Sequence, residues 1–268
     1  MSGNGKKDSH EYLAEFFGTF VFLFLGIGCV AGLKVAGASF GQWEIAIVWG
    51  VAVSMGVYLS AGVSGAHLNP SVTIALAVFA CFPKRKIIPF ILAQTFGAFC
   101  AAALAYFLYQ NLFDAALTAA AGDAAKRVAL AGAFCTFPNP GISMLQAGLT
   151  EMAITALLMA LIMALTDDGN GVPKGPMAPL LIGLLVAVIG ASFGPLTGFA
   201  MNAARDFGPR VFAYLAGWGS DVMTGYSLSK NITIPYFLVP LIMPVFGALL
   251  GAWLYKNLIG RSLACKID

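Results

Sequence analysis

The chain has 268 residues, of which 59% are hydrophobic and only 10% are charged, and its mean hydropathy is +0.85. Soluble domains carry about 25% charged residues, so this composition argues against a soluble domain. The 31 glycines favour close helix packing in a bilayer, and the dispersed net charge of +3 is too small to indicate a nucleic-acid partner. The composition therefore indicates a helical membrane protein.

Taken in chain order, the apolar segments fall into two lengths. A helix that crosses a membrane needs about 20 apolar residues, and six segments meet that requirement, at roughly 12–33, 42–61, 87–109, 144–165, 178–194 and 234–255. The first segment is longer than a signal-peptide core and lacks a small-residue cleavage site, so we expect it to be retained. Two further segments, roughly 70–80 and 203–214, are too short to cross.

Six crossings place both termini, the 82–86 loop and the 166–175 loop on one side of the membrane. These segments hold nine of the 15 Lys and Arg residues: Lys6, Lys7, Lys84, Arg85, Lys86, Lys174, Lys256, Arg261 and Lys266. Because short loops rich in Lys and Arg stay in the cytoplasm, we expect that side to be cytoplasmic. Residues 111–143 are then expected to form an extracellular connecting loop.

The second half of the chain repeats the first. AEFFGTFVFLFLG, with Glu15, corresponds to TEMAITALLMALI, with Glu151, and GAHLNPSVTIAL corresponds to GFAMNAARDFGP. Three crossings per repeat is an odd number, so the two repeats must insert in opposite orientations. We therefore expect a single domain over 1–268, with repeats at 11–110 and 144–258, one broken helix in each repeat and a substrate pathway at the midplane.

Each short segment begins at an Asn, Asn69 or Asn202, and Asn is favoured just before the first turn of a helix. Pro70 follows Asn69 at the first helical position, where its missing N–H costs nothing. If both Asn cap half-helices, their oxygens face their own backbone and their amide hydrogens face the lumen. Two opposed helix N-termini, each with about +0.5 charge, would offer donors to a hydroxyl and repel cations. The alternative is that both Asn only cap turns for structural reasons.

Together with KVAGASFGQWEI, VSGAHLNPSVTIAL, ALTDDGNGVPKGP, PLLIGLLVAVIGASFGPLTGFAMN and ARDFGPR, these motifs make nearly the whole chain similar to the aquaporin superfamily, and within it to the glycerol facilitators. The resemblance implies an all-α membrane protein with six transmembrane helices plus two re-entrant half-helices in an inverted repeat. It implies a single channel domain for passive diffusion of glycerol, other small polyols and some water, with exclusion of ions and protons. It also implies a homotetramer in the lipid bilayer of the plasma membrane, here a bacterial inner membrane, with both termini cytoplasmic and no enzyme activity, cofactor or metal.

Two signature motifs depart from the family pattern. The family carries Asn-Pro-Ala in both halves, whereas this chain has Asn69-Pro70-Ser71 and Asn202-Ala203-Ala204. Both Asn are present, so capping and donation are expected in both halves. Ala203 lacks the fixed φ and the ring packing of a Pro, which leaves the pore width beside it open. Ser71 is expected to bond to local backbone.

Four residues are implied by the resemblance to form the narrowest part of the pore: Trp49, Gly190, Phe199 and Arg205. A glycerol-like molecule has one face of C–H bonds and one of hydroxyls. The two aromatic rings can pack against the carbon face, while the guanidinium offers donors to the hydroxyls. Gly190 is expected to leave room for carbon where water-selective relatives usually carry a His. The alternative for the two aromatics is simple helix packing, whereas an ionisable residue within a membrane is a functional candidate by default.

Four further residues are expected to support the pore. Glu15 and Glu151 occupy equivalent sites, and each is expected to accept hydrogen bonds from the irregular chain before a half-helix; a proton relay is the alternative. His67 is interpreted as a hydrogen-bonded loop residue, with a pH gate as the alternative. Asp206 is expected to shape its loop, with contact to the solute as the alternative.

Two other functions fit parts of the sequence. A proton- or ion-coupled secondary transporter of a small polyol shares inverted repeats and broken helices, but this chain offers two Asn and one Arg rather than a ladder of titratable groups. An intramembrane hydrolase would need Ser71 and His67 as nucleophile and base, and their spacing across Pro70 does not supply that pair convincingly.

Overall fold

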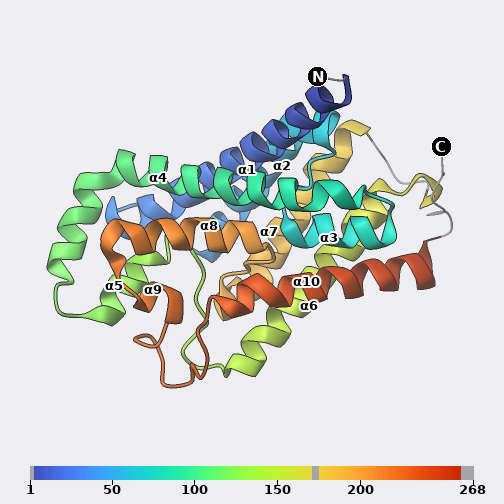
Figure 1. Cartoon of the computed structure of the whole chain (residues 1–268). Coiled ribbons are helices and arrows are strands. Elements are labelled where there is room, and N and C mark those ends of the chain that lie inside the picture. The colour runs from blue at the N-terminus through green and yellow to red at the C-terminus, as the bar shows by residue number, and fades with distance from the viewer. Residues whose placement is uncertain (1–2, 171–174, 261–268) are drawn as a thin grey trace.

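The structure, a computed structural model, describes residues 3–170 and 175–260 and contains helices and loops, with no strand in these ranges. Six helices in the described part are long and apolar enough to cross a membrane. They are α1 (Gly3–Val35), α2 (Gln42–Ser64), α4 (Ile87–Ala119), α6 (Met144–Thr166), α7 (Ala178–Thr197) and α10 (Leu238–Leu254), the last continued by η5 to Ile259. They pack into one bundle (Figure 1). The prediction of six transmembrane helices is confirmed.

Two short helices complete the bundle, α3 (Pro70–Phe79) with 10 residues and α8 (Ala203–Ala213) with 11 residues. At about 1.5 Å per residue, each reaches only about half of a 30 Å apolar layer. The predicted fold class, six spanning helices with two half-helices, is therefore confirmed. The remaining helical segments in the described part are η1 (Lys84–Lys86), α5 (Ala124–Ala131), η2 (Asp168–Asn170), η3 (Gly175–Met177), η4 (Tyr214–Trp218), α9 (Asp221–Thr224) and η5 (Tyr255–Ile259).

The segment between the two repeats is more ordered than the sequence predicts. Helix α4 continues to Ala119, ten residues beyond the predicted end of its span, and α5 follows within the expected loop. Polar residues from Gln110 onward end the apolar run, but they do not break a helix. The side chain of Asp123 caps α5 by accepting from the N–H of Lys126 at 3.0 Å. Residues 111–143 are thus partly helical rather than a plain loop.

The two halves pack in a reciprocal way. Helix α3 of the first half packs against α10 of the second, while α8 of the second half packs against α4 of the first. Helix α2 packs against α7, its counterpart. The N-terminal end of α1 and the C-terminal end of α10 lie at one end of the bundle, here called the inner end; α5 and α9 lie at the opposite, outer end (Figure 1). This arrangement is the one expected for an inverted repeat.

The contact between α2 and α7 depends on two glycines. A Cβ atom at Gly50 would collide with the carbonyl oxygen of Gly183 and with Ala187. A Cβ at Gly183 would collide with the carbonyl oxygen of Gly50 and with Ser54. Both pairs, 50 with 183 and 54 with 187, lie 133 positions apart in the sequence. Glycine therefore lets the two backbones touch, and the contact has twofold symmetry.

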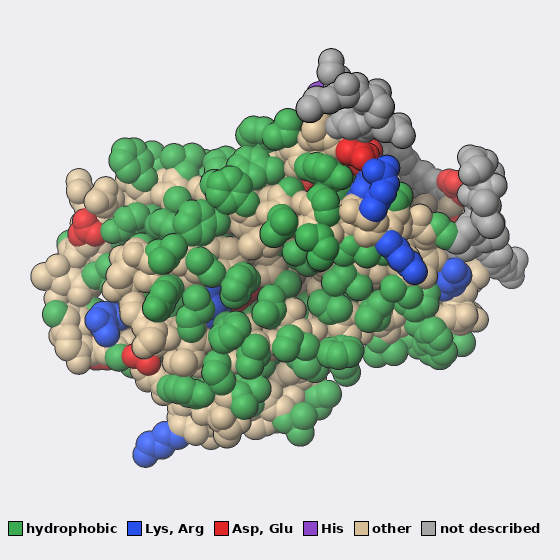
Figure 2. All heavy atoms as spheres, viewed as in Figure 1, with side chains coloured by type: hydrophobic (Ala, Val, Ile, Leu, Met, Phe, Trp, Pro, Cys, Tyr) green, Lys and Arg blue, Asp and Glu red, His purple; other side chains and the backbone are tan. Residues whose placement is uncertain are grey.

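The outer surface of the bundle is apolar. Large hydrophobic side chains such as Leu92 (63% exposed) and Phe107 (67%) point outward, and such side chains spread over the visible face of the helices (Figure 2). A soluble protein rarely exposes so continuous an apolar surface, whereas a bilayer requires one.

At the inner end, Lys86 forms ion pairs with Asp8 at 2.8 Å and Glu11 at 2.5 Å. Lys174, Arg261 and Lys266 lie outside the described residues.

Candidate solute pathway

The chain before each short helix adopts an unusual backbone conformation. Gly65, Ala66 and Leu68 have φ angles of 84°, 52° and 51°, and their counterparts Gly198, Phe199 and Met201 have 78°, 41° and 51°. Positive φ is uncommon for residues other than glycine. Such strain persists only where surrounding groups hold it in place, and it often marks a functional site.

A buried carboxylate holds each of these two segments. Glu15 accepts from the backbone N–H groups of His67 at 2.9 Å and Leu68 at 2.7 Å. Glu151 accepts from the N–H groups of Ala200 at 3.0 Å and Met201 at 2.8 Å. Both carboxylates also accept from a hydroxyl at the end of the preceding helix, Ser64 or Thr197, each at 2.6 Å. These are the hydrogen bonds that the sequence led us to expect from the two Glu.

These hydrogen bonds fix the direction of the neighbouring carbonyl groups. In a planar trans peptide, the N–H of one residue points opposite to the C=O of the residue before it. The N–H groups bound by each carboxylate therefore turn the carbonyls of Ala66 and His67, and those of Phe199 and Ala200, to the other side. All four residues line the internal cavity described below. The two strained segments thus present backbone acceptors to that cavity.

The two predicted Asn cap the short helices. Asn69 Oδ1 accepts from the N–H of Ser71 at 2.8 Å, and Asn202 Oδ1 accepts from the N–H groups of Ala204 at 3.0 Å and Arg205 at 3.1 Å. The free N–H groups at the first turns are thereby partly satisfied. The oxygen of each amide is therefore occupied by its own helix.

The amide nitrogens make a contact that the sequence does not reveal. Asn69 Nδ2 donates to the carbonyl of Met201 at 2.8 Å, and Asn202 Nδ2 donates to the carbonyl of Leu68 at 2.7 Å. Each Asn therefore ties its helix to the other half of the chain. An amide nitrogen carries two hydrogens, so one hydrogen per Asn is left for the lumen, rather than the two expected.

A cavity of about 460 Å³ lies along these groups. One part of its lining comes from the two strained segments, residues 65–69 and 199–202, which meet end to end, and from Arg205. The rest comes from the helices and, apart from Thr166, is apolar; it includes Phe22, Val53, Val57, Leu158, Ile162 and Val186. The cavity therefore has a continuous polar strip set in an apolar wall.

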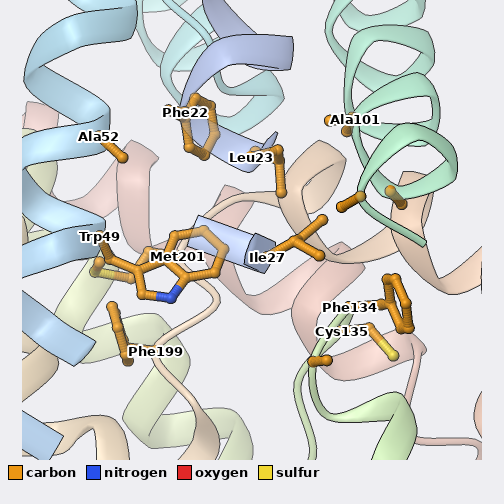
Figure 3. Packing of buried hydrophobic residues seen from close by; sticks show 14 of the residues in the cluster. Phe22, Leu23, Ile27, Trp49, Ala52, Ala101, Phe134, Cys135, Phe199 and Met201 are labelled. Carbon is orange, nitrogen blue, oxygen red and sulfur yellow. The ribbon is translucent and has the colours of Figure 1, made fainter. Parts of the chain in front are cut away.

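Three of the four predicted constriction residues meet at the outer end of this cavity. The guanidinium carbon of Arg205 lies 4.1 Å from the ring centre of Trp49, and the Trp49 and Phe199 rings meet edge to face at 6.4 Å. Figure 3 shows the two aromatic side chains beside each other, near Met201. Arg205 also donates to the carbonyl of Phe134 at 3.3 Å and is only 8% exposed. The outer end thus joins two aromatic faces to a buried guanidinium.

Gly190 does not line the cavity directly. A Cβ atom there would lie 2.8 Å from Cε2 and 2.9 Å from Cζ of Phe199. The space left by the missing side chain is therefore filled by the Phe199 ring, rather than by open pore as the sequence suggested. Gly190 acts on the cavity by letting that ring pack closely against α7. Its carbonyl accepts from Gln42 Nε2 at 2.8 Å.

Asp206 is paired, but with a residue that sequence reasoning missed. It accepts from Arg210 Nε at 2.7 Å and from the backbone N–H and hydroxyl of Thr136 at 2.7 and 2.6 Å. Arg210 is fully buried and also donates to the carbonyls of Thr136 and Val222. The signal was present, because Asp206 and Arg210 are four residues apart on one helix. This network holds the outer loops against α8, and within the described ranges no carboxylate forms an ion pair with Arg205.

His67 lies near α3, beside Thr73, which is the counterpart of Asp206 in the first half. Its Nδ1 lies 3.1 Å from the hydroxyl of Thr73, which also accepts from Gln94 Nε2 at 3.1 Å, and its ring packs on Phe82 and Phe90. The Oγ of Ser71, the nucleophile that a hydrolase would need, has no hydrogen-bond partner in the described part of the chain. His67 and Ser71 therefore do not form a nucleophile–base pair.

The family profile of the major intrinsic proteins matches residues 4–255. The chain is 65% identical over 259 residues to the glycerol uptake facilitator protein of Escherichia coli K12, covering 96% of this chain and 90% of the relative. It is 59% identical over 264 residues to a propanediol uptake facilitator of Citrobacter freundii, covering 96% of each.

A solved structure shares the fold. The X-ray structure of the aquaglyceroporin from Plasmodium falciparum matches with a TM-score of 0.80 and 33% identity over 94% of this chain and 97% of that chain. The resemblance drawn from the sequence motifs is thus confirmed, and the chain belongs to the major intrinsic protein family, as a multi-pass membrane protein of its glycerol-facilitator branch.

Proposed function

We propose that this protein is a passive channel for glycerol and related small uncharged solutes, with some water permeation. The observation that carries the proposal is the cavity with its polar strip set in an apolar wall. A polyol can place its hydroxyls on the strip and its carbon side on the wall. The names of its relatives, glycerol and propanediol uptake facilitators, support the same class of solute.

The strip replaces the water that a polyol loses on entry. The backbone carbonyls of residues 66, 67, 199 and 200 accept hydrogen bonds from hydroxyls, and one amide hydrogen of each Asn donates. Because a hydroxyl both donates and accepts, it can exchange water for this strip at little net cost. No covalent step is required, so the protein needs no catalytic residue and no cofactor.

We further propose that Trp49, Phe199 and Arg205 form the selectivity filter, with Gly190 as the support of the Phe199 ring. The aromatic faces pack on carbon, and the guanidinium donates to hydroxyls in fixed directions. Its permanent charge opposes cations. The N-termini of α3 and α8, each with about +0.5 charge at the midplane, add to that barrier.

A coupled transporter is the second candidate and is less well supported. Coupling to protons or ions needs titratable groups along the path. Among the described residues that line the cavity, only His67 and Arg205 are ionisable, and an Arg stays protonated. Both Glu are used on backbone N–H groups, which favours their structural role over a proton relay.

The expected setting is that of a homotetramer in a bacterial inner membrane with both termini in the cytoplasm. The inner end, where Lys86 lies, would then face the cytoplasm, and α5 would face outward. Native mass spectrometry in detergent tests the oligomer, and protease protection of a C-terminal tag in spheroplasts tests the orientation.

The direct test is stopped-flow light scattering on proteoliposomes with gradients of water, glycerol, propanediol and urea. We expect glycerol flux well above that of empty vesicles, linear in glycerol concentration and unaffected by a proton gradient. Flux that saturates and follows the proton gradient would support the coupled transporter instead.

A further inference from the structure

Each of the four residues assigned to the outer constriction has a repeat-related counterpart, here called its mate, on the inner side of the Asn pair. The mates lie 133 positions away in the sequence: Ile182 for Trp49, Val57 for Gly190, Ala66 for Phe199 and Val72 for Arg205. Two structural features support this spacing. Gly50 and Gly183 make reciprocal contacts, and Gly65 and Gly198 have nearly the same φ, 84° and 78°. Twofold symmetry of the backbone therefore brings the four mates to one level of the pathway.

All four mates line the same cavity as Trp49, Phe199 and Arg205. Val57 comes from α2 and Ile182 from α7, while Ala66 belongs to the polar strip and Val72 to the first turn of α3. Val72 is only 4% exposed, so it is held in the wall. The mates are inside the pathway and not on its outer face.

The chemistry of the two levels differs. The outer level carries a guanidinium and two aromatic faces, whereas the inner level carries four aliphatic side chains and no donor. The polar groups left there are the carbonyls of Ala66 and His67 and the imidazole of His67. The Thr73 hydroxyl donates to the carbonyl of Asn69 at 3.0 Å, so Nδ1 of a neutral His67 ring donates to Thr73 and its Nε2, like the carbonyls, can only accept. A solute group that needs a donor, such as the carbonyl of urea, loses water at this level without replacement.

We propose that Val57, Ala66, Val72 and Ile182 form an inner collar, a second specificity-determining position that favours solutes with exposed C–H surface, such as a diol, over a triol or urea. The outer constriction decides which hydroxyl pattern enters, and the inner collar decides how much carbon the solute must present to pass. This inference rests on the proposed solute-channel function.

The first test changes polarity without changing shape. Val72→Thr replaces a methyl group by a hydroxyl, and we expect the ratio of propanediol to glycerol permeability to fall by about fivefold, since a new hydrogen bond contributes roughly a factor of that size. Val78→Thr is the matched control, because Val78 lies on the same helix but is 59% exposed and does not line the cavity. It should leave the ratio unchanged. An unchanged ratio in Val72→Thr would overturn the proposal.

The second test copies the outer arrangement to the inner side. Phe199 has a φ of 41°, so an aromatic residue tolerates the conformation that Ala66 adopts at 52°. By the geometry of Gly190 and Phe199, however, a Phe ring at this position would collide with the side chain of Val57. We expect Ala66→Phe alone to lose glycerol flux, and the pair Ala66→Phe with Val57→Gly to recover water and glycerol flux more than propanediol flux.

The outcomes separate the collar from the channel itself. If wild-type vesicles show no glycerol flux, the proposed function fails. If wild type conducts and Ala66→Phe alone conducts every solute like wild type, the four residues do not form a collar. The single variant could lose flux because it does not fold. The paired variant controls for this, because its elution in detergent shows whether folded, membrane-inserted protein is recovered.

Discussion

Apart from the buried Glu that each half carries, the side chains that Thr73 of α3 contacts are neutral, whereas the side chains that Asp206 contacts at the equivalent position of α8 include a charged Arg. Thr73 meets His67 and Gln94 beside α3, while the equivalent position beside α8 is Asp206, which binds Arg210. What the halves share is the Glu, the Asn and the positive φ angles, and these set the backbone. What differs is the charge.

This difference separates the features that fix the backbone of the pathway from those that make its outer and inner sides chemically different. A symmetric backbone alone would make a symmetric pore. Val72 in one half and Arg205 in the other, both lining the cavity, give the outer side a cation that the inner side lacks. The buried Asp206–Arg210 pair lets α8 bind the outer loops, a task that α3 does not have. Four experiments can test this comparison of the two halves.

The largest expected effect on stability comes from Arg210→Ala. It leaves Asp206, which is 1% exposed, without its ionic partner. Breaking one side of a buried ion pair costs about 3–5 kcal/mol, measured as the free energy of unfolding in a detergent titration. The pair Asp206→Thr with Arg210→Ala gives α8 the residues of α3, Thr73 and Ala77, and should be more stable than the single variant. If the pair is no better, the unpaired charge is not the cause.

Arg205→Val gives α8 the residue that α3 carries. A unit charge at about 4 Å contributes about 4 kcal/mol at an effective dielectric constant near 20, so cation leak should rise by up to roughly a thousandfold. Glycerol flux should remain and serves as the folding control. Conductance in planar bilayers measures the cation leak. If the variant conducts cations no better than wild type, the barrier to cations lies at the two helix N-termini. Asn202→Asp is avoided because it would also lose the bond to Leu68.

Glu15→Gln and Glu151→Gln test the feature that the halves share. In either variant an NH₂ group replaces an oxygen that now accepts a backbone N–H, and an unsatisfied buried donor costs about 1–3 kcal/mol. We expect lower thermal stability and lower glycerol flux in both, of similar size. A variant with normal passive flux and an altered response to a proton gradient would instead support a proton-relay role for that Glu.

The smallest effect is expected from Ala203→Pro. The N–H of Ala203 makes no hydrogen bond within the part of the chain that the structure describes, and the first helical position accepts Pro. Stability should therefore rise by about 0.4–1 kcal/mol or stay unchanged, with flux close to wild type. Loss of folding would mean that α8 is packed around the smaller residue. Thermal unfolding and the glycerol assay give the answer.

Local signals predicted the fold well. The short helices were expected at 70–80 and 203–214 and end at Phe79 and Ala213, because Asn and the following residues mark their starts. The signals that failed are not local in the sequence. The bonds from each Asn to the opposite half, the ring that fills the space beside Gly190 and the binding of Thr136 to Asp206 join residues at least nine positions apart. Polarity alone could also not show that α4 continues outside the apolar layer.

The packing of α3 against α10 has a consequence for synthesis of the protein. The chain enters the membrane in order, yet α3 ends at Phe79 and its partner begins only at Leu238. The carbonyl of Phe79 accepts a hydrogen bond at 2.9 Å from the ammonium group of Lys256, which is made later still. At about 5–20 residues per second, a ribosome needs roughly 10–30 s to bridge that gap. During that interval α3, the first re-entrant helix, lacks the helix against which it finally packs. A chain released before α10 is made would therefore leave α3 without its packing partner and exposed to the quality-control proteases of the membrane.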